Sequence, residues 1–250
     1  MLAACLPVLS SLSGAIEEVI PPAPQHYVED AAGVLSAATE KRLNAQLEAY
    51  ERSSSNQLVV ALYRHMQSPS SVEDYTVRIA HQWGVGQKDK DNGAVLFVFV
   101  QDRKMFLQVG YGLEPRLTDA EAFRIIEGLK PYFRSGDYDG GISWAVDRMI
   151  EATEGEYQGD GRTAADRESN TAGVSLVVLI LFVLFFMVLF RSRSGRVYTD
   201  RGVRRYDDGG WGGGWGGGSG GSFGGGGFGG GGGFSGGGGG FGGGGAGGSW

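Results

Sequence analysis

The sequence predicts an α/β fold, an α/β/α sandwich around a small mixed sheet, followed by one transmembrane helix and a disordered glycine-rich tail. Three observations lead to this prediction. Helix-like and strand-like apolar patterns alternate between residues 26 and 158. Residues 174–190 carry no charge and are almost all large and apolar. Glycine supplies 47 of the 250 residues and dominates the chain after Asp208.

The expected elements of the domain follow from apolar periodicity and helix capping. Ser36, Ser71 and Thr118 each precede a helical pattern and supply a side-chain oxygen for the first free N–H groups. Residues 94–100 (AVLFVFV) are apolar on both faces, which predicts a central strand. In chain order we expect a helix, a strand, a helix, two strands and two helices, at residues 36–52, 57–63, 71–83, 94–100, 104–109, 118–129 and 139–154.

The N-terminal residues resemble an export signal. Residues 1–15 contain a short apolar run followed by small residues, as in a secretory signal peptide, but lack its basic start. The segment from Leu2 to Cys5 (LAAC) leaves a lipoprotein processing site as the alternative. Residues 16–25 are proline-rich and predict an extended linker before the domain at 26–158, and residues 159–173 predict a second linker.

Residues 174–190 are expected to cross the membrane, since a buried core helix rarely has so unbroken an apolar sequence. Six arginines follow this segment within residues 191–205. The positive-inside rule then places the C-terminal side in the cytoplasm and the domain outside it. The chain is therefore predicted to be a single-pass protein of the cytoplasmic (inner) membrane, with an extracytoplasmic domain and a cytoplasmic tail.

Residues 191–250 form a basic juxtamembrane segment and then a glycine tail with scattered Phe and Trp. Glycine loses the most conformational freedom on ordering and has no side chain to bury, so we expect this tail to be disordered. It is either an inert linker or a chain whose aromatic side chains associate weakly with themselves or with a partner.

Composition excludes several classes of function. The net charge is −6, and the acidic residues lie mostly before residue 173, which argues against a nucleic-acid partner. Cys5 is the only cysteine, so the domain has no disulfide, no zinc cluster and no thiol nucleophile. Residues 89–93 (DKDNG) do not continue as an EF-hand, and residues 110–115 (GYGLEP) lack the third glycine of a dinucleotide fingerprint. No nucleotide cofactor is expected.

Three ordered motifs carry a family resemblance. They are VEDAAGVLS from Val28, then WGVGQKDKDNGAVLFVFVQDRKMFLQVGYGLEPRLTDAEA from Trp83, and PYFRSGDYDGGI from Pro131. Over residues 26–155 the sequence closely resembles the TPM domain family, and with its apolar segment and glycine tail it looks like the YgcG-type bacterial members. The resemblance implies an α/β/α fold. For some members it also implies acid phosphatase activity and calcium binding.

The candidate site residues are those that match the motifs of the family. Asp30, Asp91, Asn92, Glu114 and Asp119 are the candidate calcium ligands, because carboxylate and amide oxygens suit a hard cation. Gly93, Gly110 and Gly112 are the residues expected to form the loops around them. The alternative roles for all of these residues are in turns and helix caps.

Two functions from different classes remain. We expect a membrane-anchored binding or scaffold module with envelope or membrane proteins as partners, with an assembly factor acting through its tail as a variant. The alternative is a metal-dependent acid phosphatase on phosphomonoesters, which rests on the resemblance alone. The candidate loops are acidic and repel phosphate unless a metal neutralises them.

Overall fold

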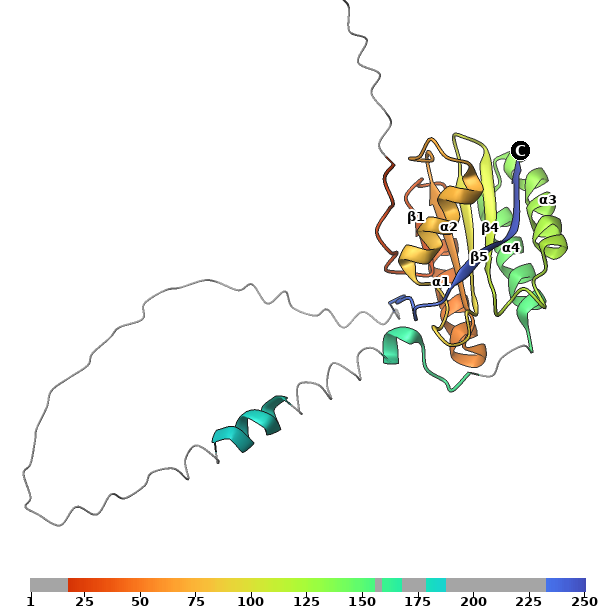
Figure 1. Cartoon of the computed structure of the whole chain (residues 1–250). Coiled ribbons are helices and arrows are strands. Elements are labelled where there is room, and N and C mark those ends of the chain that lie inside the picture. Colours follow the sequence, from red (N-terminus) through yellow and green to blue (C-terminus); the bar gives the residue numbers. More distant parts are fainter. Residues whose placement is uncertain (1–17, 156–158, 168–178, 188–232) are drawn as a thin grey trace, which may run out of the picture. The chain divides into compact units, whose positions relative to one another are not determined.

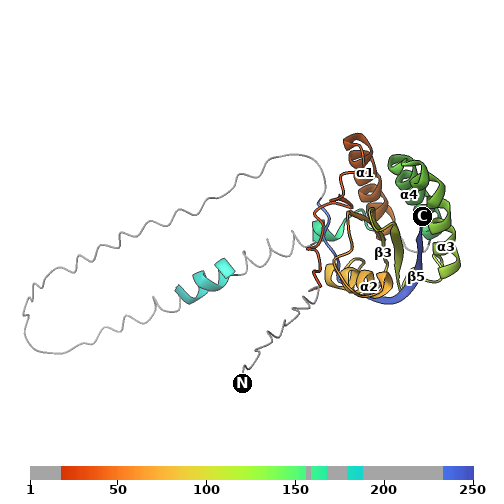
Figure 2. The same cartoon turned by 90° about the horizontal axis from the view of Figure 1, so that it is seen from above.

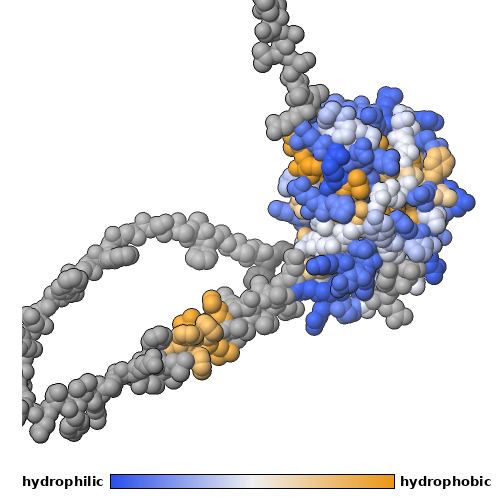
Figure 3. Space-filling model, in the orientation of Figure 1, coloured by the Kyte–Doolittle hydropathy of each residue, from blue (hydrophilic) through white to orange (hydrophobic). Residues whose placement is uncertain are grey.

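The computed structural model describes residues 18–155, 159–167, 179–187 and 233–250. Its contacts divide the chain into two units, residues 1–169 together with 231–250, and residues 170–230. In the second unit the described residues 179–187 form a helix with exposed apolar side chains (Figure 3). The rest of the predicted spanning segment, 174–178 and 188–190, lies outside the described residues. Among the helices that are described, none is both long and apolar enough to cross a bilayer.

The described residues of the first unit form five strands, four helices of twelve or more residues and a short helical turn at residues 164–167. The strands are β1 (Val28–Asp30), β2 (Gln57–Tyr63), β3 (Gly93–Phe99), β4 (Lys104–Gly110) and β5 (Phe241–Ser249). The helices are α1 (Ala37–Ser54), α2 (Val72–Trp83), α3 (Asp119–Ser135) and α4 (Tyr138–Thr153).

The sheet has the order β1-β2-β3-β4-β5 and is mixed (Figure 1). Strands β1, β2 and β3 run parallel, while β4 is antiparallel to both β3 and β5. Figure 2 shows α1, α3 and α4 on one face of the sheet and α2 on the other. The α/β/α arrangement expected from the sequence is confirmed.

The core follows from the apolar strands. Every residue of β3 is buried, as the run of apolar residues on both of its faces predicted. The three predicted capping residues Ser36, Ser71 and Thr118 are the N-caps of α1, α2 and α3, and each accepts a hydrogen bond from the backbone N–H three residues later.

Helix α3 continues past the expected end at Leu129 and includes Pro131. Proline removes one backbone hydrogen bond from a helix interior and usually ends or kinks it. Here the next turn still buries Phe133, which packs against α4 and the C-terminal Trp250. This burial offsets the lost hydrogen bond, so the helix ends at Gly136 instead, whose φ of 77° suits a left-handed cap.

The glycine tail is not disordered to its end, which corrects the prediction. Residues 241–249 form β5, an edge strand paired with β4 and coloured blue in Figure 1. The prediction considered only side-chain burial and the entropy of glycine. It did not consider that β4 leaves a row of backbone hydrogen-bonding groups open at the edge of the sheet, which another strand can pair with. The earlier part of the tail, residues 191–232, lies outside the described residues.

The described part of the proline-rich segment lies on the domain. Tyr75 donates its hydroxyl to Val19 O at 2.6 Å, and the indole of Trp83 donates to Pro21 O at 3.0 Å. Glu18 accepts two hydrogen bonds from Arg78, at 2.8 and 2.6 Å, and this guanidinium lowers the pKa of Glu18 to about 2. Residues 18–24 form neither a helix nor a strand.

Candidate functional site

Residues 234–250 of the tail follow a continuous path along the domain. Phe234 N donates to Gln25 O at 2.8 Å, beside β1. The chain then passes the turn after α2, where Gly238 N donates to Gly84 O at 2.8 Å and Lys88 N donates to Gly237 O at 3.0 Å. These backbone hydrogen bonds lead the tail from the edge of β1 to the start of β5.

Strand β5 then pairs with β4 over its whole length. The register runs from Gly110 opposite Phe241 to Lys104 opposite Ser249, with a bulge near the start of β5. Gly243 lies in this bulge with a φ of 82°, a value that favours glycine. The tail therefore completes the sheet with the backbone hydrogen bonding of an ordinary antiparallel strand.

Three aromatic side chains anchor the tail. Phe234 is 7% exposed and meets Tyr27 edge-on at 5.5 Å between ring centroids. Phe241 is 3% exposed and meets His81 edge-on at 6.3 Å, while its carbonyl lies 2.9 Å from Nε2 of the same histidine. Trp250 lies edge-on to Phe133 at 4.8 Å. Edge-to-face pairs of this kind add to the free energy gained by burying the rings.

The glycines between these anchors are sterically required at four positions. A Cβ added to Gly236, Gly237, Gly239 or Gly245 would lie closer than 3.0 Å to a carbonyl oxygen of the domain. Those oxygens belong to Trp83, Gly86, Val85 and Leu107 respectively, and a backbone oxygen cannot move aside as a side chain does. At these positions the site accepts only a strand that carries glycine.

Two of the candidate ligand carboxylates hold the tail. Asp91 Oδ1 accepts from Gly240 N at 2.7 Å, and Asp119 Oδ1 accepts from Gly245 N at 2.8 Å. Glu114 lies beside Gly244, where an added Cβ would meet its carboxylate. The structure thus brings Asp91, Glu114 and Asp119 to the tail, each at a different glycine. A backbone N–H is a favourable partner for a carboxylate.

The remaining candidate residues lie in local hydrogen-bonding roles. Asp30 accepts from the backbone N–H groups of Gly33, Val34 and Leu35 at 2.7–2.8 Å, closing the turn before α1. Asn92 is fully buried; its side chain accepts from Gln87 N and donates to Ser55 O.

The predicted loop glycines permit close backbone approach. A Cβ on Gly93 would meet Val85 O, and one on Gly110 would meet Asp91 O. Gly112 N donates to that same Asp91 oxygen at 3.0 Å. Within the described part of the chain, no three His, Cys, Asp or Glu side chains are grouped closely enough to hold a metal ion.

A buried polar network beneath the tail was missed in the sequence analysis. Glu51 is 1% exposed and accepts from Tyr27 Oη at 2.6 Å, Ala164 N at 2.7 Å and Gln57 Nε2 at 3.0 Å. Burial raises the pKa of this carboxyl group. Gln57 also donates to Ser235 O at 2.8 Å, so the network reaches the tail. Glu51 lies four residues after Leu47 on the buried face of α1, so its position in the helical periodicity is the one sequence signal of its burial, while its partners become visible only in the packed structure.

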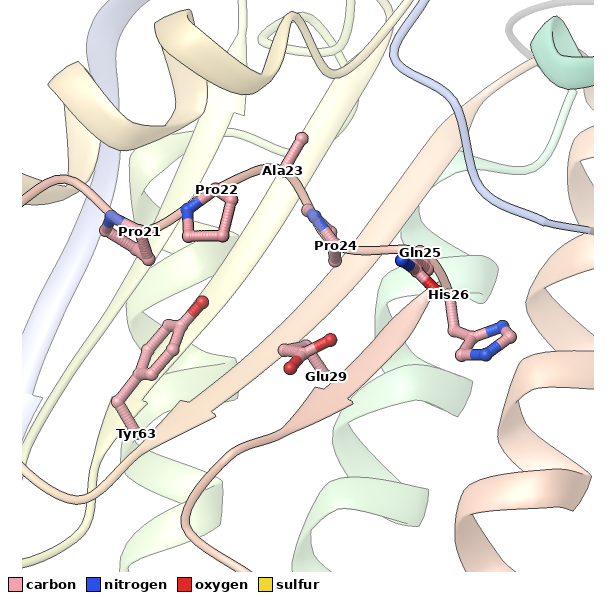
Figure 4. A pocket seen from close by; sticks show the side chains of 8 residues that line it. All are labelled: Pro21, Pro22, Ala23, Pro24, Gln25, His26, Glu29 and Tyr63. Carbon is pink, nitrogen blue, oxygen red and sulfur yellow. The ribbon is translucent and has the colours of Figure 1, made fainter. Parts of the chain in front are cut away.

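A separate cavity lies under the proline-rich segment. It has a volume of about 370 Å³ and is lined by residues 21–26, Glu29 and Tyr63. Figure 4 shows the carboxylate of Glu29 and the hydroxyl of Tyr63 pointing towards the prolines. Burial raises the pKa of Tyr63 above its ordinary range. None of the candidate ligands from the sequence lines this cavity.

The comparison with protein-family models identifies one family. Residues 28–152 match the TPM domain family. A search of curated proteins found no match. Among solved structures, the N-terminal domain of a protein from P. gingivalis is 36% identical, with a TM-score of 0.48 over 53% of this chain and 85% of that one.

Two further solution structures are less similar in sequence. The BA42 protein of the psychrophilic bacterium Bizionia argentinensis is 18% identical, with a TM-score of 0.44 over 50% of this chain and 84% of that one. The N-terminal domain of the cg2496 protein of Corynebacterium glutamicum is 17% identical, with a TM-score of 0.43 over 58% of this chain and 93% of that one.

Proposed function

This chain belongs to the TPM domain family, and we propose that it is a membrane-anchored binding module whose sheet edge holds a glycine-rich strand. The observation that carries the proposal is the fit between β4 and residues 234–250. Backbone pairing, three aromatic anchors and two carboxylate contacts all act on this one segment. Addition of a strand to a sheet edge is a common way for proteins to bind peptides.

Strand pairing supplies affinity in this proposal, and the glycine positions supply selectivity. Backbone hydrogen bonds do not distinguish one extended peptide from another. The close approach of Trp83 O, Val85 O and Leu107 O rejects any residue with a Cβ at the corresponding places. Discrimination by steric exclusion is a form of specificity that needs no additional attractive contact.

Calcium binding at Asp91, Glu114 and Asp119 remains part of the proposal, but only for a state in which the tail is not docked. Two of these carboxylates accept hydrogen bonds from the tail, so a cation bound there would compete with those contacts. The phosphatase alternative gains no support from the described side chains. The oxygens of Asp30 are occupied by the turn before α1, and metal-assisted hydrolysis needs ligands that converge on an ion.

Membrane anchoring through residues 174–190, with envelope or membrane proteins as partners, also remains a proposal. A single crossing would place β4 and β5 on opposite sides of the membrane, and strands on opposite sides cannot pair. We therefore propose that residues 174–190 anchor the chain without placing residues 191–250 in the cytoplasm, in place of the single-pass topology expected from the sequence, so that the domain and the docked tail share the extracytoplasmic side. A reporter that works only outside the cytoplasm should then be active when fused after Gly155 or after Trp250. Activity at Gly155 alone would place the tail in the cytoplasm and contradict docking within the chain.

The binding function is tested by removing the tail and returning it as a peptide. The chain truncated after residue 232 should lose hydrogen-exchange protection along β4, because the edge of the sheet is then open. A synthetic peptide of residues 233–250 should restore the protection in a saturable way.

The matched control is the same peptide with Gly245→Val, which should not bind because its side chain would meet Leu107 O. Equal binding of the two peptides, or unchanged protection in the truncated chain, would contradict the proposed groove.

A further inference from the structure

The contacts that hold β5 are all made to residues distant in sequence. Gly240 lies 149 residues after Asp91, and Gly245 lies 126 residues after Asp119. Phe241 lies 160 residues after His81. Each of these partners belongs to the folded domain, so the groove would hold the same segment equally well from another chain.

Few buried side chains hold β5 to the sheet. Within β5, Phe241 is the only buried residue, whereas all seven residues of β3 are buried. Ordering glycine costs more conformational entropy than ordering other residues, and each backbone hydrogen bond gives only a modest net gain. We therefore expect β5 to open more readily than the strands that carry the core.

An opened β5 leaves β4 as an unpaired edge, which is a template for another strand. This edge is selective, since a strand with a Cβ opposite Leu107 O or Val85 O is excluded by close contact. The strand whose glycines and aromatic residues fit the groove is the tail itself. The best-matched competitor is thus the same tail in a second copy.

We propose that β5 exchanges between copies of this chain, so that the tail of one copy completes the sheet of another. Exchange of an identical element between protomers needs no new interface, because each contact already exists within one chain. The proposal rests on the proposed function, since it requires the groove to hold the tail. The partner is a second copy of this chain, on the same side of the membrane.

Cysteine cross-linking separates docking from exchange. Lys104 and Ser249 lie directly opposite each other in the β4–β5 register and are both exposed. Residues opposite each other in an antiparallel pair are close enough for a disulfide after small adjustments. The full-length chain with Cys5→Ser, purified in detergent, is the parent for two variants, Lys104→Cys and Ser249→Cys. A third variant carries both substitutions.

The double variant should form a disulfide, which shows that the tail docks on β4 either within one chain or between two chains. An equimolar mixture of the two single variants should form a disulfide-linked heterodimer, which requires the strand of one chain on the sheet of another. Adding Gly245→Val to the Ser249→Cys chain should reduce the heterodimer at least about tenfold, whereas Gly233→Ala should leave it unchanged, because a Cβ there makes only ordinary contact.

The outcomes are distinguishable. A disulfide in the double variant, with no heterodimer in the mixture, would overturn exchange and leave the proposed groove intact. A heterodimer that is unaffected by Gly245→Val would reflect random collision and would also overturn exchange. Failure of the double variant to cross-link would overturn the docked strand itself, and the proposed function with it.

Discussion

Replacement of Phe241 by alanine in the tail peptide should weaken binding to the truncated chain by at least roughly 100-fold. The side chain is 3% exposed and contacts His81 edge-on. Truncating a buried phenylalanine to alanine typically costs about 3–5 kcal/mol. Each 1.4 kcal/mol corresponds to a factor of about ten in the dissociation constant. The lower end of this free-energy range already raises the dissociation constant roughly 100-fold. The range includes the loss of the ring contact with His81.

The assay is isothermal titration calorimetry of the chain truncated after residue 232 with peptides of residues 233–250. The control peptide carries Ser249→Ala, because Ser249 is exposed and its side chain contributes little to docking. Its dissociation constant should stay within about twofold of the parent, as for an ordinary surface substitution. If Phe241→Ala binds as well as this control, the pocket beside His81 does not anchor the tail and the reasoning is refuted.

Three other predictions concern the protein chain rather than the tail peptide. Gly245→Ala should release β5 and lower hydrogen-exchange protection along β4, as truncation after residue 232 does, whereas Gly233→Ala should not. Equal effects of the two substitutions would show that the close approach of β4 to Gly245 is not the cause of the loss. Burial raises the pKa of Glu51, so its contribution to stability is fully present below the unfolded-state pKa and is lost as pH rises through the folded-state pKa. Glu51→Gln should remove this part of the pH dependence in urea unfolding, and identical pH profiles would contradict it. Calcium at a hundredfold excess over its dissociation constant should stabilise the chain lacking residues 233–250 by about 2.7 kcal/mol and so raise its melting temperature. Asp91→Ala should abolish this rise. If millimolar calcium does not raise the melting temperature, Asp91 holds the tail and binds no calcium.

Much of the domain could be predicted because its signals are local. Capping at Ser36, Ser71 and Thr118 depends on residues three positions apart, and the core strand β3 is an unbroken apolar run. Strand β1 was missed because it is only three residues long and pairs with β2 far along the chain. A strand this short carries no periodicity of its own.

The candidate site was predicted less well, for two physical reasons. Asn92 resembles a ligand in sequence, yet its amide is fully buried and satisfied by backbone groups, a state that depends on packing. Strand β5 has almost no side chains, and sequence patterns report side chains. Its stabilisation comes from backbone groups of β4 and from carbonyls that exclude a Cβ, and neither is encoded within the tail.

The distance in sequence between β4 and β5 also governs how the protein is made. Gly245 follows its partner Asp119 by 126 residues, so a ribosome adding about 5–20 residues per second needs roughly 6 to 25 s to reach it. Small domains commonly fold faster than this. We therefore expect a four-stranded intermediate with an open edge to form before the tail is complete, and this intermediate is exposed to edge-to-edge aggregation until residues 241–249 pair with β4.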